Sequence, residues 1–80
     1  MLKVGKITHY YNNIGVAVID VLKPIKKGDR IRISGHDKEF DQIVSSMENE
    51  RKQVEKVKSG DDIGMKVDQE VKTGDVVYKL

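Results

Sequence analysis

The chain has 80 residues, of which 15 are Lys or Arg and 13 are Asp or Glu, so its net charge is +2 at pH 7. This length is enough for one hydrophobic core only, and we expect residues 1–80 to form a single domain. The chain contains no cysteine, which excludes disulfides and thiolate metal sites and fits a reducing compartment. No apolar stretch approaches the roughly 20 residues of a membrane span, so we expect a cytoplasmic protein without a membrane partner.

The N-terminal quarter of the chain predicts two strands. Lys3–Tyr11 is rich in β-branched and aromatic residues, and Gly5 within it indicates a bulge or the close approach of another backbone. Asn12-Asn13 predicts a turn, because asparagine tolerates the left-handed region. Ile14–Leu22 is apolar on both faces, which predicts a strand that is covered at least partly on both sides; Pro24 then ends it.

Three Gly-Asp pairs, at 28–29, 60–61 and 74–75, predict turns, and each precedes an apolar alternation. Glycine can adopt a positive φ at little cost, and the aspartate can accept hydrogen bonds from nearby backbone amides. After the first pair, the period-2 pattern of Lys26–Ser34 places Ile31 and Ile33 on one face, which we expect to be buried. The strands after the other two pairs bury Ile63, Met65 and Val67 in one case and span Val76–Leu80 in the other.

The segment between residues 39 and 58 has a weaker pattern. Glu39–Met47 predicts a strand whose inward face cannot be assigned, Glu48–Lys52 a polar loop, and Gln53–Lys58 a short strand or extended segment. A helix over 47–58 is the alternative that composition allows, although only Met47, Val54 and Val57 would form its apolar stripe. Six or seven short strands with Gly turns indicate an all-β fold, and closure into a barrel would remove the exposed edges.

Motifs for catalysis are missing from the sequence. There is no phosphate-binding Gly-x-x-x-x-Gly-Lys-Ser/Thr loop, no Gly-x-Ser-x-Gly elbow and no cysteine nucleophile. His9 and His36 are the only histidines, and no acidic cluster frames either of them. The pair Asp61-Asp62 fits turn chemistry better than catalysis. We therefore expect a protein that is not an enzyme and has no catalytic residue, metal, cofactor or nucleotide.

One group of residues predicts a binding site. Residues 1–40 carry eight Lys and Arg against four Asp and Glu, a charge of +4, whereas residues 41–80 carry −2. This basic half contains aromatic and basic side chains of the kind that bind single-stranded nucleic acid: Lys6, His9, Tyr10, Tyr11, Arg30 and Arg32. The alternative is that one tyrosine packs in the barrel and the other lies on its rim.

Five segments together resemble the second domain of translational GTPases of the elongation factor Tu class: Val4–Ile7, Lys27–Gly35, Val44–Met47, Ser59–Gly64 and Thr73–Val77. The segment Gly5–Tyr11 with Ile14–Val18 looks still more like the small C-terminal barrel of the collagenase-like peptidase family, whose members include RNA-modifying proteins. Both resemblances imply a small closed Greek-key β-barrel of the translation-factor domain 2 type. The chain holds no GTPase domain and no peptidase-like domain, and no residue of the transfer-RNA pocket can be matched.

The resemblance implies a non-catalytic binding module, because elongation factor second domains contact the aminoacylated end of transfer RNA and the ribosome. We expect RNA, either transfer or ribosomal, or a ribonucleoprotein as the partner. The alternative is a protein-interaction module that docks on a separately encoded enzyme of the collagenase-like peptidase or RNA-modification type. The apolar strand Ile14–Leu22 supports this alternative, because apolar surface outside a barrel marks a partner site.

Overall fold

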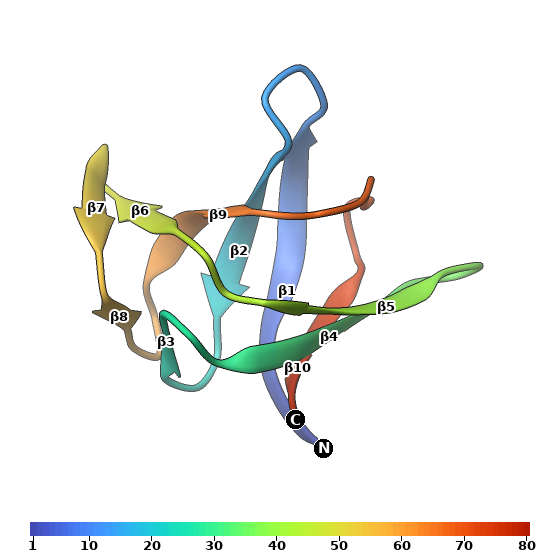
Figure 1. Cartoon of the computed structure of the whole chain (residues 1–80), viewed down its shortest axis with the longest axis horizontal. Coiled ribbons are helices and arrows are strands. Elements are labelled where there is room, and N and C mark those ends of the chain that lie inside the picture. The colour runs from blue at the N-terminus through green and yellow to red at the C-terminus, as the bar shows by residue number, and fades with distance from the viewer.

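The computed structural model describes all 80 residues, and every regular element in it is a β-strand (Figure 1). The all-β prediction is confirmed, and the alternative helix over 47–58 is wrong. Because the chain forms no helix, it has none that could cross a membrane. The strands are β1 (Leu2–Tyr11), β2 (Val16–Val21), β3 (Ile25–Lys26), β4 (Arg30–Ser34), β5 (Glu39–Ile43), β6 (Met47–Asn49), β7 (Lys52–Val54), β8 (Lys56–Val57), β9 (Asp62–Lys66) and β10 (Val76–Lys79).

Eight strands form one antiparallel sheet in the order β5-β4-β10-β1-β2-β9-β6-β7, and β3 and β8 form a separate two-stranded ribbon. The sheet curls on itself around a core of 17 buried apolar side chains, which gives the half-barrel of Figure 1. The predicted inward residues Ile31, Ile33, Ile63, Met65 and Val67 are all at most 5% exposed, so their burial is confirmed.

Gly5 lies where the first strand bends around the core. The β1–β10 register shifts between Lys3 and Gly5, and a Cβ added to Gly5 would lie 2.6 Å from Cγ2 of Ile19 on β2. The predicted bulge and the predicted close approach therefore occur at the same residue. A second shift, between Ile7 and His9, affects the β1–β2 register near the hairpin end.

The three Gly-Asp turns have one construction, Lys-x-Gly-Asp, at Lys26–Asp29, Lys58–Asp61 and Lys72–Asp75. The glycines have φ of 95°, 94° and 98°, as the third position of a type II turn requires. In each turn an Oδ2 atom of the aspartate accepts from the N–H of the lysine three residues earlier, at 2.9, 3.0 and 2.9 Å. The predicted turns are confirmed, and so is the turn role of Asp61.

Each turn also forms two backbone hydrogen bonds with one buried residue of another segment. The glycine N–H donates to that residue's carbonyl, and the aspartate carbonyl accepts from the same residue's N–H, over distances of 2.8–2.9 Å. The residues bound in this way are Val44, Val21 and Ile7, all at most 1% exposed. The turns thus tie three points of the core to the sheet, although their spacing in the sequence is irregular.

Two predictions for the middle of the chain need correction. The predicted strand Glu39–Met47 is divided, because β5 ends at Ile43 and Met47 begins β6. The predicted loop Glu48–Lys52 is part of the β6–β7 hairpin, whose two turn residues, Glu50 and Arg51, have φ of 54° and 67°. A two-residue turn of this kind normally contains Gly or Asn, so the sequence gives no hairpin signal here.

The edge strands β5 and β7 are not paired with each other, so the ladder does not close the barrel. Instead the buried side chain of Gln42 on β5 is hydrogen-bonded to residues at and just beyond the end of β9, and we call this contact the seam. Its Nε2 donates to the carbonyl of Lys66 at 3.0 Å, and its Oε1 accepts from the N–H of Asp68 at 2.8 Å. The small β-barrel prediction holds at this level, whereas a closed Greek-key barrel of translation-factor type stays a prediction.

Candidate functional site

The six predicted RNA-binding residues do not form one cluster. Arg32 on β4 is opposite Tyr78 on β10, which in turn is opposite Lys3 on β1. Tyr10 lies seven residues beyond Lys3 on the same strand, which corresponds to about 23 Å. The arginines and the aromatic residues are therefore at opposite ends of β1, and Lys6 lies between them, opposite Val76 and Asp20.

The tyrosines at the β1–β2 hairpin differ in burial. Tyr10 is half-buried and packs against the core, whereas Tyr11 is 47% exposed. The rings of His9 and Tyr11 meet edge to face with their centroids 4.4 Å apart. This arrangement corresponds to the alternative interpretation, in which one tyrosine packs in the barrel and the other lies on its rim.

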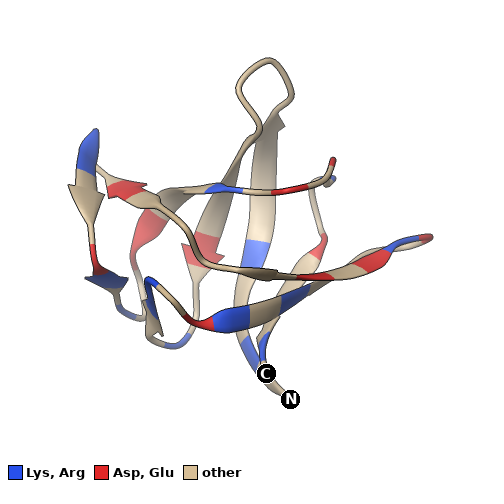
Figure 2. Cartoon of the chain, in the orientation of Figure 1, with Lys and Arg blue, Asp and Glu red and all other residues tan.

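The guanidinium of Arg32 forms an ion pair with a carboxylate. Its Nε and Nη2 donate to Oδ1 and Oδ2 of Asp41 at 2.6 and 3.0 Å, and its Nη1 lies 3.5 Å from Sδ of Met1. Figure 2 shows the basic residues of β4 beside the acidic residues of β5. The hydrogen bond from Arg32 lowers the pKa of Asp41 below its ordinary value. A forked ion pair of this kind leaves little of the guanidinium free for a phosphate.

The Arg32–Asp41 pair predicts a pH-dependent contribution to stability. Because the pKa of Asp41 is lowered in the folded state, the contribution is present above the ordinary carboxyl pKa and disappears as the pH falls through the folded value. Urea unfolding should therefore show Asp41→Asn less stable than the parent near pH 6, and the difference should shrink toward pH 2. Glu48→Gln, on β6, is the control, since Glu48 forms no ion pair. A difference that stayed constant with pH would contradict the assignment.

The aromatic neighbour of the arginines is Tyr78, which the sequence reasoning did not select. Arg30, Arg32 and Tyr78 point outward, because they alternate with the buried residues Ile31, Ile33 and Val77. The only local signal for Tyr78 is its position in the alternation of the last strand. Its contact with β4 depends on a pairing between segments 46 residues apart, which local patterns do not contain.

Exposed apolar side chains surround this arginine and tyrosine group. Met1, Ile43 and Leu80 are 69%, 49% and 46% exposed. Ile43 is opposite Arg30, the N–H of Leu80 donates to the carbonyl of Arg30 at 3.0 Å, and Met1 contacts Arg32. We call this outer surface the terminal face, because both chain ends lie at it (Figure 1); it consists of Met1, Arg30, Arg32, Ile43, Tyr78 and Leu80.

Metal-ligating groups do not converge anywhere in the chain. No three His, Cys, Asp or Glu side chains lie close enough to hold a metal ion. The buried carboxylates, Asp29 and Asp75, accept hydrogen bonds from backbone amides in their turns. The arrangement offers surfaces for binding: the terminal face, and the lysine-lined hollows beside the β3–β8 ribbon.

Comparison with known proteins relates the chain to proteins assigned as peptidases. It is 34% identical over 80 residues, 99% of its length, to a protein of Methanocaldococcus jannaschii described as an uncharacterized protease, and it spans about 20% of that protein. The C-terminal domain of a candidate U32 peptidase from Geobacillus thermoleovorans has the same fold, with a TM-score of 0.93 at 16% identity over 99% of this chain and 92% of that one. Its selenomethionine variant gives a TM-score of 0.91 at 15% identity, over 96% and 98%.

No protein-family profile matches the chain. Of the two resemblances found in the sequence, the comparisons support the likeness to the small C-terminal barrel of the collagenase-like, or U32, peptidase family. The likeness to the second domain of elongation factor Tu stays a prediction. The chain therefore resembles a domain that, in its relatives, is one part of a longer protein.

Proposed function

We propose that this chain is a non-catalytic docking module that packs on a U32-peptidase-like domain through the terminal face. The observation that carries the proposal is the chemistry of this face, where exposed apolar side chains surround two arginines and a tyrosine. Tyr and Arg are enriched among the residues that dominate protein interfaces, and apolar neighbours exclude water around them. The Methanocaldococcus relative supports the choice of partner, because four fifths of its length lies outside the match.

The RNA interpretation stays a prediction that has lost part of its basis. It needs aromatic faces and free cations at one place. The residues selected from the sequence do not meet there, because the exposed Tyr11 lies at the opposite end of β1 from the arginines and Arg32 is paired with Asp41. The same ion pair favours a protein partner. Because Asp41 already holds the side chain of Arg32 in place, binding a protein there costs less conformational entropy.

The proposal is tested by mixing this chain with the part of the Methanocaldococcus protein outside the 80-residue match and measuring association by calorimetry. We expect a one-to-one complex. Tyr78→Asp and Leu80→Glu should each weaken it at least tenfold, because each places a charge in the apolar part of the terminal face. Ile14→Glu, which changes an apolar residue that is 56% exposed at the β1–β2 turn, should have little effect.

If Ile14→Glu weakened the complex as much as Tyr78→Asp does, the interface would lie at the β1–β2 hairpin end instead. If there were no complex, but a salt-dependent shift of transfer RNA, the RNA interpretation would replace the docking proposal. Circular dichroism of each variant is required first, since a loss of binding counts only when the fold is retained.

A further inference from the structure

A second surface, beside the β3–β8 ribbon, has the features of a separate binding site. Two adjoining hollows of about 400 and 190 Å³ share Pro24, Lys56 and Val57 as lining residues. Val57 is buried and Pro24 is exposed. Because both residues line the two hollows, they form the apolar floor that the hollows share. We call the two together the lysine cleft; it includes no residue of the terminal face.

The lysine cleft carries an excess of positive charge. Its lining contains four lysines, and only Lys79 has a carboxylate partner, Asp29 Oδ2 at 3.4 Å. The other three have no ion pair, and they are Lys26, Lys56 and Lys58. Asp29 and Asp61 are the only acidic residues of the lining, so the cleft alone has a net charge of +2, as much as the whole chain. Like charges that converge without partners favour an anionic ligand.

One edge of the ribbon is available for backbone hydrogen bonds. Ile25 pairs with Val57 and Lys26 with Lys56, and the N–H of Lys27 donates to the carbonyl of Glu55 at 2.8 Å. Because hydrogen-bonded and non-hydrogen-bonded pairs alternate in an antiparallel ladder, the N–H and C=O of Lys56 point away from β3. No other strand pairs with β8, so these two groups lie on its outer edge without a backbone partner.

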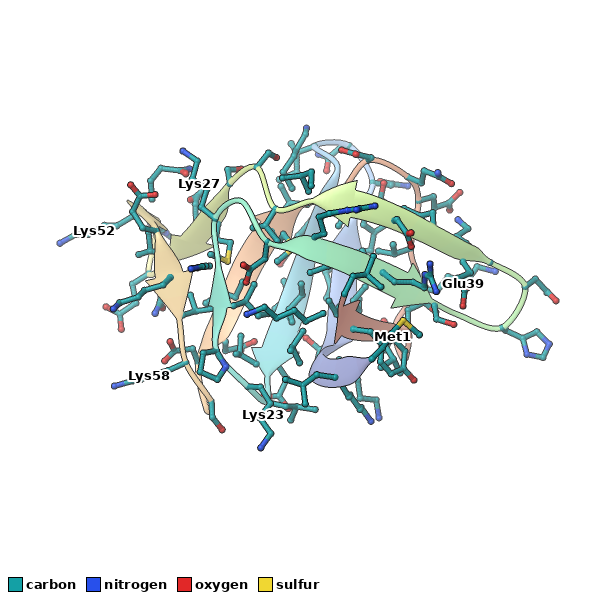
Figure 3. The ribbon with its side chains drawn as sticks, turned by 60° about the horizontal axis from the view of Figure 1, so that its bottom comes forward. Met1, Lys23, Lys27, Glu39, Lys52 and Lys58 are labelled. Atoms are coloured by element: carbon teal, nitrogen blue, oxygen red, sulfur yellow. The ribbon has the colours of Figure 1, made fainter.

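The side chains of the lysine cleft favour a peptide over a nucleic acid. Base stacking requires aromatic faces, and none of the chain's aromatic residues lines the cleft. A free strand edge, an apolar floor and flanking ammonium groups match the backbone, the apolar side chains and the carboxylates of an extended acidic segment. Figure 3 shows Lys58 projecting outward beside the ribbon, where it can reach such a segment.

We propose that the lysine cleft binds an extended, acidic peptide segment that pairs with the outer edge of β8 at Lys56. Alternate carboxylates of the segment contact the ammonium groups of Lys26, Lys56 and Lys58, and the side chains between them rest on Pro24 and Val57. This site is independent of the docking function proposed above, because the two surfaces share no residue.

The test uses fluorescence anisotropy with a labelled peptide of alternating Glu and Val, its Gln-for-Glu version, and single-stranded oligouridine with the same number of charges. We expect the acidic peptide to bind most tightly, and its affinity to fall with added salt. The double variant Lys56→Gln with Lys58→Gln should weaken it about tenfold. The matched double variant Lys27→Gln with Lys52→Gln removes the same charge from lysines outside the cleft and should change the affinity less than twofold.

Strand pairing is tested with two peptides that are N-methylated at alternate residues. The peptide whose methyl groups face β8 should bind at least fivefold more weakly, and the one whose methyl groups face solvent should not. The proposal is overturned if both double variants lose affinity equally, if oligouridine binds more tightly than the acidic peptide, or if neither methylated peptide is weakened. Binding of the Gln-for-Glu peptide at the same affinity would overturn it as well.

Discussion

Gly5→Ala is expected to lower the free energy of unfolding by about 1–3 kcal/mol, the usual cost of overpacking a filled core. The new methyl group would lie 2.6 Å from Cγ2 of Ile19 and 3.3 Å from the carbonyl oxygen of Asp20. Ile19 is fully buried, and the carbonyl belongs to the backbone of β2, so neither can move freely. Gly64→Ala is the matched control, since its methyl group would meet only Cγ1 of Val16, at 3.2 Å.

A double-mutant cycle assigns this cost to one contact. Ile19→Ala alone should cost about 2–5 kcal/mol, as truncation of a buried aliphatic side chain does. It also removes Cγ2, so Gly5→Ala should cost less in the Ile19→Ala background than in the parent. Urea denaturation measures all four proteins, with sulfate added where a variant is marginal. Costs that add to within about 0.5 kcal/mol would show that the clash is not with Ile19.

The elements that the sequence predicted correctly are those whose cause is local. Glycine and aspartate fix the Lys-x-Gly-Asp turns within four residues, and the alternation of Ile31 and Ile33 assigns their face within one strand. The β6–β7 hairpin was missed for the complementary reason. Glu50 and Arg51 occupy the left-handed region, where such residues are uncommon, so surrounding packing rather than local preference sets this turn.

The candidate site was predictable only in part, because strand order decides which side chains become neighbours. Arg30 and Arg32 were selected from the sequence and do lie on an outward face. Their aromatic neighbour is Tyr78, since β10 lies between β4 and β1, and the selected Tyr10 and Tyr11 are carried to the far end of β1. The lysine cleft has the same origin, because Ile25–Lys26 and Lys56–Val57 meet only in the folded chain.

The seam of the barrel depends on one buried amide, and this leads to the prediction for Gln42→Glu. The substitution keeps an acceptor for the N–H of Asp68 but leaves no donor for the carbonyl of Lys66. At pH 7 a carboxylate would therefore be buried against a carbonyl oxygen. We expect the free energy of unfolding to fall by about 2–4 kcal/mol, from the lost hydrogen bond and the desolvated charge.

The pH dependence of this loss of stability shows whether the cause is a buried charge or a poor fit of the new side chain. Burial raises the pKa of the introduced carboxyl above its ordinary value of about 4.3, so the folded state binds the extra proton between the two values. Stability relative to the parent should then rise as the pH falls from 7 to 4, because the protonated carboxyl can donate to the Lys66 carbonyl. Gln42→Leu should be destabilised at both pH values, and Gln53→Glu on exposed β7 should be nearly neutral. A loss for Gln42→Glu that is equal at pH 4 and pH 7 would show that the seam does not depend on the amide's hydrogen bonds.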